Sequence, residues 1–233
     1  MSSVASISSP VRTKFRNAVR LQEAITARVE RKVLLWLAKR VPESISPDHL
    51  TALGFAAQFL AGVAYGVARW NKYVLWLATL FIAVNWLGDS LDGTLARYRQ
   101  RLRPRYGFYV DHMADTFGAV FLMSGLAVSR YLHWQIAVGM LVAFLLLSVE
   151  SYLTTYTIGK FCMSHGLFGP TEIRMLLMIG NVALLYRPHT HLLGRELLLF
   201  DVGGAIAIVG MAGMAAIAAV RHARDLYRQE RLG

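Results

Sequence analysis

The sequence has little of what a soluble or secreted domain usually contains. One cysteine, Cys162, is present among 233 residues, which excludes an intrachain disulfide and a cysteine-rich metal cluster. Charged residues make up 17% of the chain, below the roughly 25% that is typical of soluble domains. We expect no cleavable signal segment, because residues 1–10 are polar and the segment that follows is too basic to form an apolar signal core.

Long apolar runs take the place of the missing charge. Hydrophobic residues make up 55% of the chain, and the runs over residues 73–87, 134–149 and 202–220 are nearly unbroken. A run of about 20 such residues matches the roughly 30 Å hydrocarbon core of a membrane. The sequence therefore predicts an all-α integral membrane protein. We place its six transmembrane helices at residues 48–68, 73–97, 107–129, 134–157, 170–186 and 198–220.

The segment before the first span has a different pattern. From Val11 to Arg40, apolar residues recur at helical spacing with Arg and Lys on the opposite face. This pattern predicts an amphipathic helix on the membrane surface, or else a soluble regulatory arm. We expect a cytoplasmic arm with an interfacial helix over residues 1–46, a six-helix catalytic domain over 47–222 and a cytoplasmic tail over 223–233.

The distribution of basic residues predicts the orientation. A net charge of +11 would suggest a nucleic-acid partner in a soluble protein, but here the charges lie between the spans, so we expect none. If both termini are cytoplasmic, most Lys and Arg residues lie on that side. The opposite side then holds only Arg69, Lys72, Arg130, Arg187 and Arg195. This predicts a multi-pass protein of the cell (inner) membrane with both termini in the cytoplasm.

Four aspartates lie within the expected spans, where a charged side chain costs about 2.5–3.5 kcal/mol and therefore indicates function. Asp89 and Asp92 end the second span, and Asp111 and Asp115 begin the third. Spacings of three and four residues place each pair on one helix face. Counting the helical rise from the intervening loop places Asp92 level with Asp111, and Asp89 level with Asp115. The four carboxylates are expected to meet in a shallow cavity open to the cytoplasm.

Such a cluster needs a compensating cation, because the carboxylates would otherwise repel each other and take up protons. Ligands that are all oxygen suit Mg²⁺ or Mn²⁺, and these ions usually keep positions free for substrate phosphates. The acids by themselves are also compatible with a cation- or proton-coupled transporter.

The residues around the acids favour the enzyme. They read Asp89-Ser90-Leu91-Asp92-Gly93-Thr94-Leu95-Ala96-Arg97 and, after residues 98–106, Gly107-Phe108-Tyr109-Val110-Asp111-His112-Met113-Ala114-Asp115. This closely resembles the signature of the CDP-alcohol phosphotransferase (phosphatidyltransferase) family, D-x-x-D-G-x-x-A-R, a short gap, then G-x-x-x-D-x-x-x-D. Every fixed position of the signature is filled.

The resemblance implies a phospholipid-biosynthesis transferase that moves a substituted phosphate from a CDP-linked donor to an acceptor alcohol and releases CMP. It implies that Asp89, Asp92 and Asp111 bind two divalent ions, Mg²⁺ or Mn²⁺. Asp115 is then the general base, with a further contact to a metal. Anionic membrane lipids and a second copy of the chain, in a homodimer, are the other partners it implies.

Small residues and one arginine complete the expected donor side, together with Asp89. Gly93 and Ala96 allow a nucleotide or a neighbouring helix to approach closely. Arg97 is placed to pair with the donor's phosphates. Gly107 is expected to relieve crowding where the third span begins. We expect the basic run from Arg97 to Arg105 to hold anionic headgroups and part of the donor.

The acceptor side is less specific. Lys160 and Arg174 are the basic residues near the cytoplasmic ends of the fourth and fifth spans, and Glu172 lies between them. An acceptor phosphate would favour a clamp by Arg174. A lipid or amino-alcohol acceptor would instead give Glu172 a role as an auxiliary base. The sequence leaves glycerol phosphate, inositol phosphate, serine, amino alcohols and diacylglycerol open.

Overall fold

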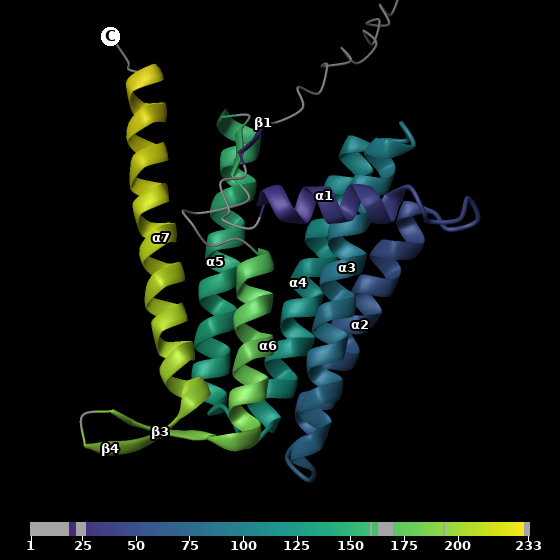
Figure 1. Cartoon of the computed structure of the whole chain (residues 1–233). Coiled ribbons are helices and arrows are strands. Elements are labelled where there is room, and N and C mark those ends of the chain that lie inside the picture. The colour runs from purple at the N-terminus through teal and green to yellow at the C-terminus, as the bar shows by residue number, and fades with distance from the viewer. Residues whose placement is uncertain (1–18, 22–26, 159, 163–169, 193, 231–233) are drawn as a thin grey trace, which may run out of the picture.

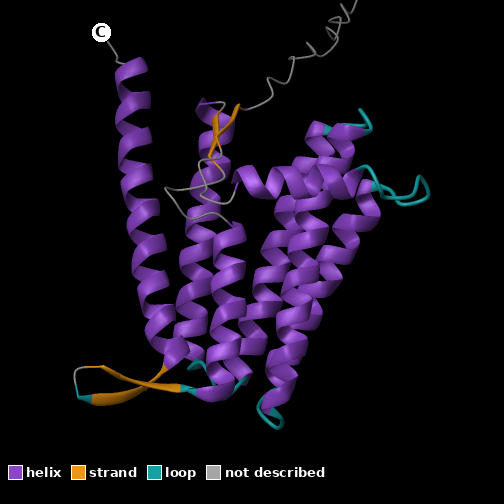
Figure 2. Cartoon of the chain, in the orientation of Figure 1, coloured by secondary structure: helices purple, strands orange, loops and turns teal. Residues whose placement is uncertain are grey.

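The computed structural model describes residues 19–21, 27–158, 160–162, 170–192 and 194–230. Helices dominate, and two short pairs of strands complete the described part (Figures 1 and 2). The helices are α1 (Ala27–Ala38), α2 (Pro47–Val67), α3 (Leu75–Tyr98), α4 (Pro104–Val128), α5 (Trp134–Ile158), α6 (Pro170–Tyr186) and α7 (Leu199–Gln229), with a 3-10 turn, η1 (Lys72–Val74), before α3. The strands are β1 (Val19–Leu21), β2 (Lys160–Cys162), β3 (His189–Leu192) and β4 (Arg195–Leu198).

Helices α2 to α7 correspond to the six expected segments. Within the described residues, four stretches are long and apolar enough to cross a membrane: Pro47–Val67, Lys72–Tyr98, Trp134–Ile158 and Leu199–Gln229. Helix α4 carries Asp111 and Asp115 in its first half, which lowers its hydropathy, and α6 has 17 residues. The chain is therefore a helical membrane protein, and its described part holds four candidate spanning helices.

The N-terminal helix is shorter than expected. Within the expected range 11–40, α1 begins at Ala27, and β1 lies before it, parallel to β2 with Val19 opposite Lys160. Residues 19–21 thus pair with a strand instead of continuing the helix, and residues 11–18 and 22–26 lie outside the described part. Helix α1 crosses the end of the bundle and contacts α3 (Figure 1). Its Leu34 and Ala38 are buried there with Leu91 and Leu95.

The α2 helix packs closely against α3 and α4 through glycines. A Cβ atom on Gly88 would lie 2.8 Å from the Cα of Gly54, and one on Gly125 would lie 1.9 Å from the backbone oxygen of Gly62. The backbones can approach this closely because these positions lack side chains. Gly66, which lies at helical spacing from Gly62, has no atom within 4 Å of an added Cβ among the described residues.

A polar network lies inside the apolar core between α2, α3 and α6. The Tyr65 hydroxyl donates to Asn181 Oδ1 at 2.7 Å, and Asn181 Nδ2 donates to Thr79 Oγ1 at 3.1 Å. Tyr65 and Asn181 are fully buried. Because buried polar groups require partners, this chain of bonds fixes how α6 faces α2 and α3.

Helix α7 packs against α5. His222 Nδ1 lies 2.5 Å from Glu150 Oε1, and Thr154 Oγ1 donates to Glu150 at 2.9 Å. At the other end of the bundle, the backbone N–H of His133 donates to Asp201 at 2.9 Å. The C-terminal end of α7 lies at the same end of the bundle as α1, and the β3–β4 hairpin lies at the opposite end (Figure 1).

The crossing of α2 and α4 gives a stability prediction. Gly125→Ala should lower the free energy of unfolding by about 1–3 kcal/mol, the usual effect of overpacking, because the added Cβ meets the Gly62 backbone. Gly66→Ala is the matched control and should be neutral or slightly stabilising, since alanine favours helix. Thermal unfolding in detergent measures both, and equal midpoints for the two variants would contradict the prediction.

Candidate active site

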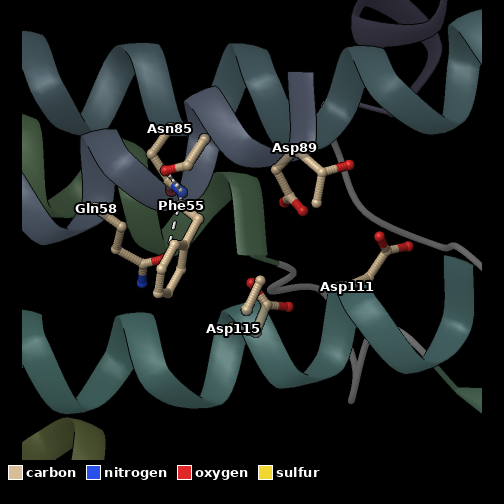
Figure 3. Close-up of a pocket in the computed structure, with 9 residues that line it drawn as sticks. Phe55, Gln58, Asn85, Asp89, Asp111 and Asp115 are labelled. Atoms are coloured by element: carbon tan, nitrogen blue, oxygen red, sulfur yellow. Dashed lines mark hydrogen bonds between the residues drawn. The ribbon is translucent and has the colours of Figure 1, made fainter. Parts of the chain in front are cut away.

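A small pocket opens where α2, α3 and α4 meet. Asp89 from α3 and Asp111 and Asp115 from α4 point into one space, as Figure 3 shows. Its other lining residues are Thr51, Gly54, Phe55, Gln58, Asn85 and Ala114. Three of the four aspartates that the sequence analysis expects to meet therefore line one pocket.

Asp92 lies beside this pocket and is held by neutral donors. Its side chain is 5% exposed, and Thr51 Oγ1 of α2 donates to Asp92 Oδ2 at 2.5 Å. The backbone N–H of Gly93 donates to the other carboxylate oxygen. Asp92 is also within electrostatic range of Asp89 and Asp111. The four carboxylates thus form one cluster, with Asp92 at its buried edge.

Arg174 brings a cation to this cluster. It comes from the second turn of α6, and its Nη1 lies 2.8 Å from Asp89 Oδ2, while its Nη2 lies 3.9 Å from Asp115 Oδ1. The Arg174 side chain is 12% exposed, against 33% for Asp89 and 41% for Asp115. A residue that the sequence placed on the acceptor side therefore lies between the two aspartate-bearing helices.

The donor set suits a hard divalent ion, since it consists of carboxylate oxygens. In the ranges that the structure describes, no three His, Cys, Asp or Glu side chains are gathered as a metal-binding group. The reason is visible in the contacts: Asp89 is turned toward Arg174, and both oxygens of Asp92 accept hydrogen bonds. The residues fit such an ion because their donor atoms are carboxylate oxygens. Two of these carboxylates, Asp89 and Asp115, already contact a positively charged group, the Arg174 guanidinium.

The expected donor-side residues lie on the α3–α4 end of the site. A Cβ on Gly93 would meet only the tip of Arg97, at 3.6 Å, so no neighbouring helix among the described residues uses this glycine for close packing. Ala96 is half-buried, and the exposed Arg97 donates to Thr94 Oγ1 at 3.3 Å. Gly107 has no described atom within 4 Å of an added Cβ. The expectation that Gly107 relieves crowding is wrong within the described chain, because α4 begins one turn earlier, at Pro104.

Part of the basic loop has a structural role. Arg99 donates to the backbone oxygens of Val41, Pro42 and Ile45 at 2.9, 2.8 and 2.6 Å. Arg103 forms an ion pair with Asp48 at the start of α2. These two arginines of the expected headgroup-binding run therefore tie the α3–α4 loop to the α1–α2 loop.

The residues predicted on the acceptor side differ in where the structure places them. Glu172 is buried one turn into α6, whereas Arg174 reaches the aspartates. The backbone of Lys160 lies in β2, and its side chain is outside the described part, as are residues 163–169. The structure thus brings Arg174 to the carboxylates, and the prediction for Lys160 lies outside the described side chains.

Comparison with known proteins identifies the family. Residues 44–219 match the family model described as CDP-alcohol phosphatidyltransferase. The chain belongs to the CDP-alcohol phosphatidyltransferase family. It is 29% identical over 147 residues to an uncharacterized protein of Aquifex aeolicus (strain VF5), covering 60% of this chain and 70% of that protein. It is 30% identical over 113 residues to an archaetidylinositol phosphate synthase of Pyrococcus horikoshii, covering 48% of this chain and 53% of that protein.

Membership in the CDP-alcohol phosphatidyltransferase family supports a membrane transferase of phospholipid biosynthesis.

The sequence motif does not include the residues that α2 contributes to the pocket, namely Thr51 and Gln58. It also does not include Asn85, whose Nδ2 donates to the Gly54 oxygen at 3.0 Å. It also missed Glu30 of α1, which contacts α3 and α6. Thr51, Gln58 and Asn85 are polar residues in apolar stretches, a pattern that the sequence displays, whereas Glu30 lies among basic residues and has no such signal.

Thr51 gives a test of how α2 supports the family motif. Thr51→Val keeps the side-chain shape but removes the donor to Asp92, leaving that oxygen without its partner. Hydrogen bonds to charged groups are worth about 1.5–3 kcal/mol, so transferase kcat/KM should fall about 10- to 100-fold. Thr51→Ser should retain most of the activity. A Thr51→Val enzyme as active as wild type, measured by CMP release, would remove Thr51 from this role.

Proposed function

We propose that the protein transfers a substituted phosphate from a CDP-linked donor to an acceptor alcohol and releases CMP. The observation that carries this proposal is the cluster of the four motif aspartates, with the Arg174 guanidinium between Asp89 and Asp115. Family membership supports the reaction class. The pocket is lined by residues of α2, α3 and α4, and α1 crosses the bundle beside α3 (Figure 1).

Asp89, Asp92 and Asp111 would hold two Mg²⁺ or Mn²⁺ ions, with Asp115 at their edge. When bound, such ions neutralise the donor's diphosphate and the charge on departing CMP. The chain's own groups do the rest. Thr51 and the Gly93 N–H keep Asp92 oriented, while Arg97, Gly93 and Ala96 lie along the face of α3 that would receive the donor.

Asp115 is the proposed general base. Its carboxylate takes the proton of the acceptor hydroxyl, and the hydroxyl oxygen attacks the phosphorus farther from cytidine. The bond from that phosphorus to the bridging oxygen breaks, and CMP leaves with the bond's electrons.

The acceptor is proposed to carry a phosphate. Arg174 is a largely buried arginine that contacts Asp89 and Asp115, and a guanidinium binds phosphate in a bidentate manner. The Pyrococcus relative is named as an archaetidylinositol phosphate synthase, which is consistent with a phosphorylated acceptor here. Glu172 is buried in the first turn of α6, and this scheme assigns it no auxiliary-base role.

The proposed membrane arrangement uses all six helices from α2 to α7, with α1 in the interface and both termini in the cytoplasm. The positions of α1 and the end of α7 at one end of the bundle support it, as does the basic α3–α4 loop at that end (Figure 1). Trp36 and Val33 on α1 are exposed, as an interfacial helix requires.

The reaction class is tested by CMP release from the purified protein. CMP should appear only when a CDP-linked donor such as CDP-diacylglycerol, an acceptor and Mg²⁺ or Mn²⁺ are all present. The acceptor panel contains glycerol phosphate, inositol phosphate, serine and diacylglycerol. Cation flux in sealed vesicles without CMP formation would favour a transporter instead, and nucleotide binding without turnover would indicate an inactive scaffold.

Single substitutions of the aspartates are the control for this assay, because they distinguish the general base from the metal ligands. Asp115→Asn should abolish transfer while leaving donor binding largely intact, because a base acts mainly in the transition state. Asp89→Asn should weaken both metal dependence and donor binding. Near-normal turnover by Asp115→Asn would exclude it as the base.

The acceptor class is tested separately with Arg174→Ala and Glu172→Gln. Loss of one charge-assisted contact, about 1.5–3 kcal/mol, should raise the acceptor KM about 10- to 100-fold in Arg174→Ala, with little change for the donor. Glu172→Gln should be nearly silent in the same kinetics. A silent Arg174→Ala with a severe Glu172→Gln would overturn the phosphorylated-acceptor proposal.

A further inference from the structure

Glu30 brings an acidic side chain from α1 to the edge of the aspartate site. Its Oε1 accepts hydrogen bonds from Trp86 Nε1 and Ser90 Oγ of α3, both at 3.1 Å. It also accepts one from Thr171 Oγ1 of α6 at 3.0 Å. A single carboxylate oxygen therefore joins three helices. Ser90 directly follows Asp89, and Thr171 lies three residues before Arg174.

The second oxygen of Glu30 is in a different situation. Oε2 is buried and has no hydrogen-bond partner within the described residues. The three donors to Oε1 are all neutral, so they do not balance the carboxylate charge. A buried acceptor without a partner costs about 1–3 kcal/mol, and more when it is charged. Buried carboxylates are normally paired with a cation.

Arg174 is the cation placed to be that partner. The Glu30 carboxylate is within electrostatic range of the Arg174 guanidinium. Thr171 and Arg174 lie three residues apart on α6 and therefore share one face of the helix. The bond from Thr171 to Glu30 thus brings the Arg174 face of α6 against the Glu30 carboxylate.

The proposed function sets up a competition for Asp89. Arg174 Nη1 contacts Asp89 at 2.8 Å, and Asp89 is also a proposed metal ligand. A guanidinium and a divalent cation on the same carboxylate repel each other strongly in poorly solvated surroundings. The Arg174 guanidinium must therefore move away from Asp89 when the ion binds. Because the guanidinium is largely buried, it then needs a different carboxylate as its partner.

We propose that Glu30 is the second partner carboxylate of Arg174, which receives its guanidinium when a divalent cation binds Asp89. This rests on the proposed function, because it takes Asp89 as a metal ligand. Glu30 is then a positioning residue. It keeps Arg174 at the mouth of the site, where the remaining guanidinium N–H groups are available to an acceptor phosphate.

A double-mutant cycle read by Mn²⁺ binding tests this proposal. The full-length protein in detergent is titrated with Mn²⁺ and followed by electron paramagnetic resonance, without donor or acceptor. Glu30→Gln should weaken Mn²⁺ binding about tenfold, within the range for coupled contacts. Arg174→Gln should strengthen it. In the Arg174→Gln background, Glu30→Gln should change it less than about twofold, since no guanidinium remains to be received.

Two further variants test whether Glu30 affects Mn²⁺ binding through the position of its carboxylate or only through the net charge of the protein. Glu43→Gln removes an exposed acid from the loop between α1 and α2, and should leave Mn²⁺ binding unchanged. Glu30→Asp keeps the charge but withdraws the carboxylate, and should give the same Arg174-dependent loss as Glu30→Gln. It also provides the measurement if Glu30→Gln does not fold, which thermal unfolding shows.

The outcomes distinguish this inference from the proposed function. An equal loss in both backgrounds, or no loss from Glu30→Gln and Glu30→Asp, overturns the Glu30 proposal while Mn²⁺ binding and CMP release by the wild type remain. A wild-type protein that binds no Mn²⁺, or binds it equally after Asp89→Asn, overturns the metal site and the Glu30 proposal with it.

Discussion

Four carboxylates held among apolar helices are the constraint on which the rest of this structure depends. Each would be expensive in a membrane-embedded bundle if it stood alone, so each must receive a donor or a cation. Thr51 and the Gly93 N–H serve Asp92, and Arg174 serves Asp89 and Asp115. These partners come from three different helices. The acidic cluster is therefore compatible only with a bundle in which α2, α3, α4 and α6 hold fixed positions.

The glycine contacts explain how α2 comes close enough to take part. Gly54 and Gly88 let α2 and α3 meet backbone to backbone, one residue before Asp89. Gly62 and Gly125 do the same for α2 and α4, farther along α2. With larger residues at these positions α2 would move outward, and Thr51 would lose Asp92. Helix packing and site geometry thus depend on the same few glycine contacts, so substitutions that destabilise the packing of α2 also disturb the site.

The sequence predicted what depends on local periodicity. Each aspartate pair lies at a spacing that fixes one helix face, and a short loop makes their helices antiparallel, so the meeting of Asp89, Asp111 and Asp115 followed from residues 89–115 alone. It did not predict Thr51, Glu30 or the position of Arg174, because those contacts join residues between 41 and 141 positions apart in the chain or depend on how α6 packs. The start of α1 was misplaced because residues 19–21 pair with a strand distant in sequence, which helical periodicity does not reveal.

Glu30 shows how α1, which packs across α3, becomes part of a buried site. Leu34 and Ala38, one and two turns along the same stripe of α1, already supply apolar packing against α3. An apolar residue at position 30 would continue that stripe without any desolvation penalty. A carboxylate there instead requires donors from α3 and α6, and leaves one oxygen that needs a cation. The acid therefore has two effects: its Oε1 joins α1 to α3 and α6, and its charge lies within electrostatic range of Arg174.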